Sequence, residues 1–393
     1  MEKSELRSAL SLAGIFALRM LGLFLILPVF SMHAKGLSGG DQATLVGLAL
    51  GIYGFVQACL HIPLGMLSDR YGRRPVVVLG LVLFVVGAVI AGSHDDLLWI
   101  TVGRAIQGAG AISAAVTAWL ADLTREETRT RAMAMVGGSI ALTFALSLVL
   151  ASPMHESIGL SGMFYFMAVL GLGAILIALW VVPEQENESK TPFTAKFSEV
   201  FFNQDLFRLN IGVLILHAVQ IALFLTLPRL LVKADLALPD HWKLYLPAVL
   251  ISFVCMAPII MVSERRKRMK PAFILGITCM MAAQLMMASF DSLTALALAV
   301  LVYFIGFNIL EAMQPSLVSR WASHAKGTAL GIYNTTQSAG LFLGGLLGGW
   351  VLQSWGDRAV FYLGAALIFA WLIIALTMRE LSQKVANGES IKI

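Results

Sequence analysis

Long runs of hydrophobic residues recur along the whole 393-residue chain, and short breaks between them carry most of the charges. Each run can cross the ~30 Å hydrocarbon core of a bilayer as a helix, which takes about 20 residues. Strands of a membrane barrel would instead alternate hydrophobic and polar positions. The pattern therefore predicts an all-α membrane protein. Twelve transmembrane helices are expected, near residues 10–32, 43–65, 76–93, 98–121, 132–154, 160–182, 209–232, 243–263, 271–290, 293–319, 327–353 and 358–380.

A hydrophilic break at residues 183–208 divides these helices into two six-helix bundles, expected at 1–182 and at 209–393, the second with a short tail. Apolar residues within the break recur at helical spacing, which predicts a cytoplasmic amphipathic helix on the inner leaflet. A floppy connector is the alternative. The apolar residues are Phe193, Phe197, Val200 and Phe201.

Two internal repeats favour a pseudo-symmetric architecture. Ser68-Asp69-Arg70, with Pro75 beyond it, recurs as Ser263-Glu264-Arg265 with Pro271. The segment 49–57 has a second echo at 329–337. Many transporters are built from repeated halves and bind their substrate where the halves meet. Chance similarity between apolar helices is the alternative for the second echo.

Composition excludes a soluble protein. The chain is 58% hydrophobic and only 13% charged, with a mean hydropathy of +0.82, whereas about a quarter of the residues in soluble domains are charged. The first apolar run is longer than a signal-peptide core and no cleavage pattern follows it, so we expect a retained helix. The three cysteines lie singly in apolar runs, which predicts neither a disulfide framework nor a metal site.

The distribution of positive charge predicts the topology. With both termini in the cytoplasm, 21 of the 28 Lys and Arg residues fall on the cytoplasmic side, in agreement with the positive-inside rule. The net charge of +5 is therefore explained by membrane orientation, and no nucleic-acid partner is expected. We expect a multi-pass protein of the cell inner membrane, surrounded by lipid and working as a monomer.

The loop between the second and third expected helices reads Gly65-Met66-Leu67-Ser68-Asp69-Arg70-Tyr71-Gly72-Arg73-Arg74. It resembles the G-x-L-x-D-R-x-G-R-[RK] loop of the major facilitator superfamily, which implies that fold. The resemblance also implies a conformational latch, in which Asp69 faces the helix that begins near Gly327. Arg73 would bond Asp122, and a role of the arginines in topology alone is the alternative. The latch residues are Gly65, Asp69, Arg70, Gly72, Arg73 and Asp122.

The fourth expected helix contains Gly103-Arg104-Ala105-Ile106-Gln107-Gly108-Ala109-Gly110. This resembles the R-x-x-Q-G-x-G motif of proton-coupled members of the superfamily, so it implies proton coupling. A hydrogen bond from Arg104 to carbonyls of neighbouring helices is the alternative. The fifth helix carries Ala151-Ser152-Pro153 where drug/proton antiporters have a glycine–proline pair, which weakens the case for drug export.

Three further segments resemble the YajR-type branch of the superfamily. They are residues 17–22, 241–243 and 308–312. The namesake of that branch has a soluble domain after the twelfth helix, and we expect that domain to be absent here.

Ionisable residues deep in the expected helices are few, and a buried charge is costly enough to indicate function. A rise of ~1.5 Å per residue places Arg19, His217 and Glu311 level with one another and Arg104 nearer the periplasmic side, out of direct contact. We expect Glu311 to carry the proton and His217 to be its partner. Arg19 would supply fixed positive charge or bind an anionic substrate. A static buried ion pair is the alternative.

Neutral polar and aromatic residues near these groups suggest a cavity lining that suits an amphipathic small molecule. They are Phe24, Tyr53, Gln57, Phe224, Asn308, Gln314, Tyr333 and Gln337.

These observations predict a secondary transporter that exports a small organic molecule in exchange for protons. Proton-coupled uptake or facilitated diffusion is the alternative, and a membrane sensor is a remote one. No catalytic motif is found, so no enzyme activity is expected. The proton gradient would supply the energy, with no cofactor and no metal.

Overall fold

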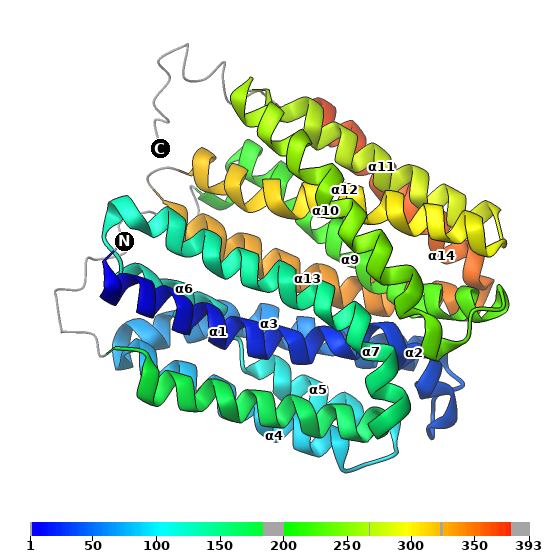
Figure 1. Cartoon of the computed structure of the whole chain (residues 1–393), viewed down its shortest axis with the longest axis horizontal. Helices are drawn as coiled ribbons and strands as arrows, with labels where there is room; N and C mark the ends of the chain where they lie inside the picture. Colours follow the sequence, from blue (N-terminus) through cyan, green and yellow to red (C-terminus); the bar gives the residue numbers. More distant parts are fainter. Residues whose placement is uncertain (1, 184–199, 267, 323–324, 379–393) are drawn as a thin grey trace. The chain divides into compact units, whose positions relative to one another are not determined.

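The computed structural model describes residues 2–183, 200–266, 268–322 and 325–378, and these residues are almost entirely helical (Figure 1). The only bridge between extended residues in this part of the chain joins Ser38 and Asp96. The all-α prediction is therefore confirmed. The chain divides into two compact units, Met1–Pro192 and Phe193–Ile393, which we call the N-terminal and C-terminal units. The expected amphipathic helix falls largely on residues 184–199, outside the described residues.

The N-terminal unit begins with α1 (Lys3–Leu25), α2 (Leu27–His33) and a short 3-10 turn, η1 (Ala34–Gly36). Pro28, near the start of α2, is the reason the chain changes helix there, since proline fits the first turn of a helix but not its interior. The remaining elements are α3 (Ala43–Tyr71), α4 (Arg73–Gly92), α5 (Leu97–Ala109), α6 (Ser113–Asp122), α7 (Glu126–Leu176) and the π-helical turn η2 (Ile177–Val181).

The C-terminal unit begins with α9 (Gln204–Lys233), which starts inside the stretch expected to be linker. Asn203 explains this start, because its side chain caps the helix by accepting from the backbone N–H groups of Asp205 and Leu206. The other elements are η3 (Leu238–Asp240), α10 (Trp242–Arg265), α11 (Met269–Ser289), α12 (Leu293–Trp321), α13 (Lys326–Trp355) and α14 (Asp357–Leu376).

The twelve expected segments all coincide with helices, but not one to one. The first is divided between α1 and α2, the fourth is broken between α5 and α6, and the fifth and sixth are joined in α7 across Gly159, whose φ is 66°. Within the described residues, nine helices are long and apolar enough to span a membrane. A count of twelve spans stays a prediction, as does the cytoplasmic location of the termini.

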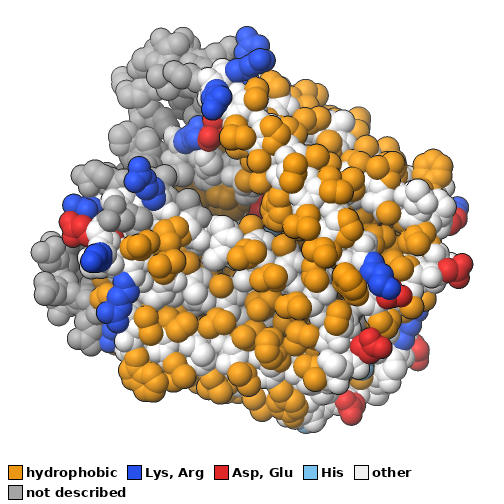
Figure 2. Space-filling view, in the orientation of Figure 1, with side chains coloured by type: hydrophobic (Ala, Val, Ile, Leu, Met, Phe, Trp, Pro, Cys, Tyr) orange, Lys and Arg blue, Asp and Glu red, His pale blue; other side chains and the backbone are white. Residues whose placement is uncertain are grey.

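The same pairing of helices organises each unit. In the N-terminal unit α1 packs mainly on α7, and in the C-terminal unit α9 packs mainly on α13. Figure 2 shows that hydrophobic side chains cover most of the visible surface, while charged side chains gather mainly where helices end. Large apolar side chains such as Phe55, Trp180 and Val254 are exposed. This surface fits a lipid environment, because the exposure of so large an apolar area to water is unfavourable.

Three glycines bring α13 into backbone contact with α9. A Cβ on Gly340 would lie 2.4 Å from the carbonyl oxygen of Leu214, and one on Gly344 would lie 2.2 Å from that of Ala218. A Cβ on Gly348 would lie 2.9 Å from the side-chain Cβ of Ala222 and 3.2 Å from its Cα. Small residues at i, i+4 and i+8 let helix backbones approach closely. The packing fixes which polar side chains of the two helices meet.

Candidate functional site

Two polar clusters contain the residues singled out in the sequence, one in each unit. The cluster in the C-terminal unit is built on α9, α12 and α13, and the cluster in the N-terminal unit on α1, α3 and α5. The description below takes each unit by itself.

His217 is the centre of the C-terminal cluster. Its Nδ1 lies 3.1 Å from the carbonyl oxygen of Val213, and its Nε2 lies 2.6 Å from Nε2 of Gln337. A carbonyl oxygen only accepts, so we assign the ring hydrogen to Nδ1. The neutral ring then accepts an N–H from the Gln337 amide at Nε2. The close packing of α13 on α9 is what brings this amide to the imidazole.

Glu311 lies beside His217, as expected from their depths in the sequence. Its Oε2 is 3.6 Å from His217 Nε2, which suits an ion pair with a protonated imidazole but is too long for a hydrogen bond. The histidine side chain is 6% exposed and the glutamate side chain 34% exposed. Glu311 Oε2 has no hydrogen-bond partner among the described residues. The imidazole is therefore held by two hydrogen bonds, whereas the buried Oε2 of the carboxylate accepts none from the described residues.

Aromatic and amide groups surround this pair. The phenol of Tyr333 donates to Gln314 Oε1 at 3.3 Å, and Tyr303 and Tyr333 both lie within electrostatic range of the Glu311 carboxylate. The ring of Phe307 lies 6.2 Å from that of His217. Glu311 thus lies near aromatic rings and neutral polar groups.

Two members of the expected cavity lining have other roles in this unit. Asn308 donates to the hydroxyl of Ser252 on α10 at 2.8 Å. Sequence reasoning had not identified Ser252. Phe224 is fully buried, with its ring 6.4 Å from that of Tyr245. Both side chains are therefore used in packing between helices.

Tyr53 is the centre of the N-terminal cluster. It is nearly buried, and its hydroxyl accepts hydrogen bonds from Arg19 Nη2 and from Gln57 Nε2. The Cζ atoms of Arg19 and Arg104 lie 5.9 Å and 5.1 Å from the centre of its ring. Both guanidinium groups therefore make cation–π contacts with the same tyrosine ring.

This arrangement differs in part from the expectation that Arg104 stands apart. The two guanidinium groups meet on one tyrosine because arginine side chains are long, and a depth worked from the backbone ignores that reach. Gln107, which sequence reasoning gave no role, accepts from Arg104 Nη1 at 3.2 Å. The sequence signal for Gln107 was its position in the same helical motif, three residues after Arg104. Phe24 is not part of this cluster, since its ring packs edge-on against Phe144 at 5.1 Å.

The motif loop forms a compact ionic cluster at one end of the N-terminal unit. Arg73 donates from Nε to Asp122 at 2.9 Å, pairs with Asp69, and donates from Nη1 to Ser68 at 2.8 Å. The contact expected between Arg73 and Asp122 is thus present. Gly72 joins α3 to α4 with a φ of 95°, a conformation that L side chains rarely adopt.

The other residues of the motif are used differently. Arg70 lies over the ring of Tyr71, with its Cζ 5.4 Å from the ring centre. A Cβ on Gly65 would make an ordinary contact with Ala114, at 3.5 Å. Arg74 donates to the carbonyl oxygen of Val182 at 2.8 Å. These contacts do not join Arg70 or Gly65 to the ionic cluster.

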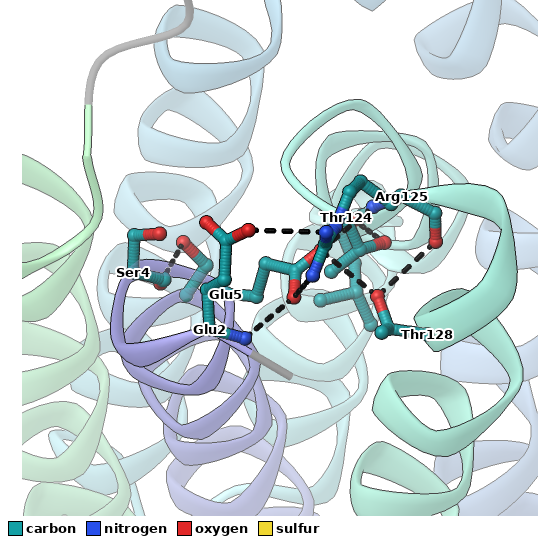
Figure 3. A network of polar contacts seen from close by, with 8 residues as sticks. Glu2, Ser4, Glu5, Thr124, Arg125 and Thr128 are labelled. Carbon is teal, nitrogen blue, oxygen red and sulfur yellow. Dashed lines mark hydrogen bonds and ion pairs between the residues drawn. The ribbon is translucent and has the colours of Figure 1, made fainter.

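A network that sequence reasoning missed ties the start of α1 to the start of α7 (Figure 3). The Glu5 carboxylate accepts from the backbone N–H and Nε of Arg125, each at 3.0 Å, and from the Thr128 hydroxyl at 2.9 Å. Arg125 also pairs with Glu2 at 3.0 Å. A carboxylate at a helix N-terminus is favourable because it satisfies free N–H groups there.

Comparison with known proteins supplies relatives for the whole chain. A family model described as Major Facilitator Superfamily matches residues 12–319 and 250–392. The inner membrane transport protein YajR of Escherichia coli (strain K12) is 40% identical over 386 residues, which are 97% of this chain and 85% of that protein. The multidrug resistance protein MdtH of Sodalis glossinidius is 26% identical, over 90% of this chain and 89% of its own.

Solved structures share the fold at low identity. The crystal structure of a D-xylose-proton symporter matches with a TM-score of 0.77 and 15% identity, over 95% of this chain and 98% of the other.

Proposed function

The chain belongs to the Major Facilitator Superfamily of membrane transporters, and on this basis we propose that it exports small organic molecules in exchange for protons. It is a multi-pass protein of the inner membrane, like its relative YajR. Within this proposal the proton gradient supplies the energy, no cofactor takes part, and the transporter works as a monomer. The multidrug resistance name of MdtH supports export of organic molecules.

The pair formed by Glu311 and His217 supports proton coupling, and it is the observation that carries the proposal. We assign the exchanged proton to Glu311, whose carboxylate is 34% exposed and lies 3.6 Å from the imidazole. A carboxylate next to an imidazole gives two neighbouring groups that can each hold a proton.

Protonation of this pair changes the hydrogen bonds between three helices. When His217 is neutral, its Nε2 accepts from Gln337 on α13. When the imidazole is protonated, Nε2 becomes a donor that faces the Glu311 carboxylate, and the Gln337 amide must turn its oxygen toward the ring. The proton therefore alters how α13 is held against α9 and α12. Such a local change can bias a transporter between two states.

We propose that the motif loop is the conformational latch. Arg73 holds Asp69 at the end of α3 and Asp122 at the end of α6, so one side chain ties three helix ends together. The arginine side chain is 16% exposed and Asp122 28% exposed. Pairs in this partly exposed setting are weak enough to break and reform during a cycle.

Uptake of the substrate together with protons, which is symport, is the second candidate function. The observation that favours it is Ala151-Ser152-Pro153, which replaces the glycine–proline pair of the antiporters. Pro153 lies inside α7 and does not end it. The direction of proton movement separates the two candidates.

The test is proton flux in proteoliposomes that contain a pH-sensitive dye, measured against a panel of organic compounds. Antiport predicts that an inward substrate gradient drives protons out, whereas symport predicts that protons enter with the substrate. Glu311→Gln should lower the flux at least tenfold, because the amide cannot carry a proton. Glu156→Gln is the control, since that exposed glutamate lies outside both clusters. Undiminished flux in Glu311→Gln would refute the carrier role.

A further inference from the structure

Two arginines in the N-terminal unit are buried without a counter-charge. Arg19 is 0% exposed and Arg104 is 3% exposed. Within the described part of this unit, neither has an ion pair with aspartate or glutamate; their polar contacts are the Tyr53 hydroxyl, Gln107 Oε1 at 3.2 Å and the Leu50 carbonyl at 3.4 Å. Arginine stays protonated in proteins. The cluster therefore carries two positive charges with only neutral acceptors.

Several hydrogen-bond donors in this cluster are also unused. Nε and Nη1 of Arg19, Nε of Arg104 and Nε2 of Gln107 are buried and have no acceptor among the described residues. A buried donor without a partner costs more than a hydrogen bond contributes, and a buried charge costs more still. Three helices nevertheless bring these donors to one tyrosine. An arrangement of this kind is expected where the missing acceptor is a ligand.

The chemistry of the free donors indicates the class of that ligand. Arginine N–H groups bind carboxylates by strong, charge-assisted hydrogen bonds, and Nε and Nη1 of Arg19 both lack an acceptor among the described residues. A neutral hydroxyl or amide would leave both charges uncompensated. A cation would be repelled by both. The acceptor that fits is an anion with more than one oxygen, such as a carboxylate.

We propose that the Arg19–Tyr53–Arg104 cluster recognises the carboxylate of a small organic anion, so that the substrates of this transporter are organic acids. The inference rests on the proposed transport function and names its substrate class. Arg19 binds the carboxylate through its positive charge and an unused donor, Nε or Nη1, and Arg104 with Gln107 supplies the second charge and a further donor. Tyr53 holds both guanidinium groups in place through its ring and hydroxyl.

The test compares acids with amides of the same shape. Thermal stability of the purified full-length protein is measured with acetate, benzoate and 1-naphthoate, and with acetamide, benzamide and 1-naphthamide. At least one acid should bind about tenfold or more tightly than its amide, because a hydrogen bond to a charged group contributes about 1.5 to 3 kcal/mol. No preference for any acid overturns the proposal.

Substitutions test whether the preference for acids over amides depends on Arg19. Arg19→Gln should abolish the difference between acid and amide, whereas Arg358→Gln should keep it, because Arg358 is exposed and pairs with Asp291 in the other unit. If Arg19→Gln does not fold, Arg19→Lys decides: it keeps the charge but loses the guanidinium N–H groups that face the ligand, so acid binding should weaken about tenfold. An unchanged preference in the Arg19 variant that folds overturns the proposal.

The outcome is separable from the test of proton coupling. Flux of a neutral or cationic compound that depends on Glu311, without any preference for acids, would refute the carboxylate site and leave proton-coupled transport standing. Binding of acids without proton movement would refute proton-coupled transport and leave the carboxylate site standing.

Discussion

Gly344→Ala is the substitution whose effect follows most directly from the structure. The added Cβ would lie 2.2 Å from the carbonyl oxygen of Ala218 and 2.6 Å from its Cα. These are backbone atoms of α9, so no side chain can turn away to make room. Relief requires α13 to move from α9 by about 1 Å, because tightly packed interiors tolerate little overlap.

The magnitude follows from that displacement. Overpacking of this kind costs about 1 to 3 kcal/mol, which for a unit of this size lowers Tm by roughly 2 to 12 °C. Gln337 lies two helical turns before Gly344 on α13. A shift of about 1 Å stretches its 2.6 Å contact with His217 beyond hydrogen-bond range. Loss of stability should therefore come with loss of proton-coupled flux.

Gly331→Ala is the matched control, since it lies on the same helix and a Cβ there meets nothing within 4 Å. Alanine is the better helix former, so this variant should be as stable as the parent or slightly more stable. The assays are thermal unfolding in detergent and dye-reported flux in proteoliposomes. Equal Tm values for the two alanine variants would refute the close approach of α13 to α9.

Two further substitutions test the N-terminal unit. Gly72→Ala should cost about 1 to 3 kcal/mol, since it places a side chain at a φ of 95°. Gly65→Ala, in the same motif but inside α3, should be nearly neutral. A comparable loss of Tm in both variants would contradict the conformational argument. Glu5→Gln should lower Tm more than Glu2→Gln, because Glu5 is buried and accepts from both Arg125 and Thr128, while Glu2 is exposed. Thermal unfolding of both variants compares them, and a larger loss of Tm in Glu2→Gln would show that the exposed acid matters more.

The sequence predicts most of the fold because hydrophobic runs alone locate the helices. It does not predict the break after Ala109, since hydrophobicity continues across residues 98–121. The break depends on tertiary contacts: a Cβ on Gly108 would lie 2.4 Å from the Tyr53 carbonyl oxygen, and one on Gly110 would lie 2.3 Å from that of Gly80. Close approaches between distant segments leave no periodic trace in the chain.

The candidate site, too, could be predicted from the sequence only in part. Helical rise was enough to predict that His217 and Glu311 are neighbours, because both lie near the middle of their helices. It was not enough to predict that Arg19 and Arg104 share Tyr53, since side-chain reach and helix rotation decide that. The contact of Asn308 with Ser252 depends on rotation in the same way.

The pairing of α9 with α13 also sets an order of events during synthesis. About 90 residues separate the end of α9 from the start of α13, which a ribosome adds in roughly 5 to 18 s at about 5 to 20 residues per second. During that interval α9 lacks its main partner, although most of its apolar residues are buried in the folded chain. His217 likewise lacks the Gln337 amide that later binds it. We therefore expect α9 to reach its final packing only after α13 has been made.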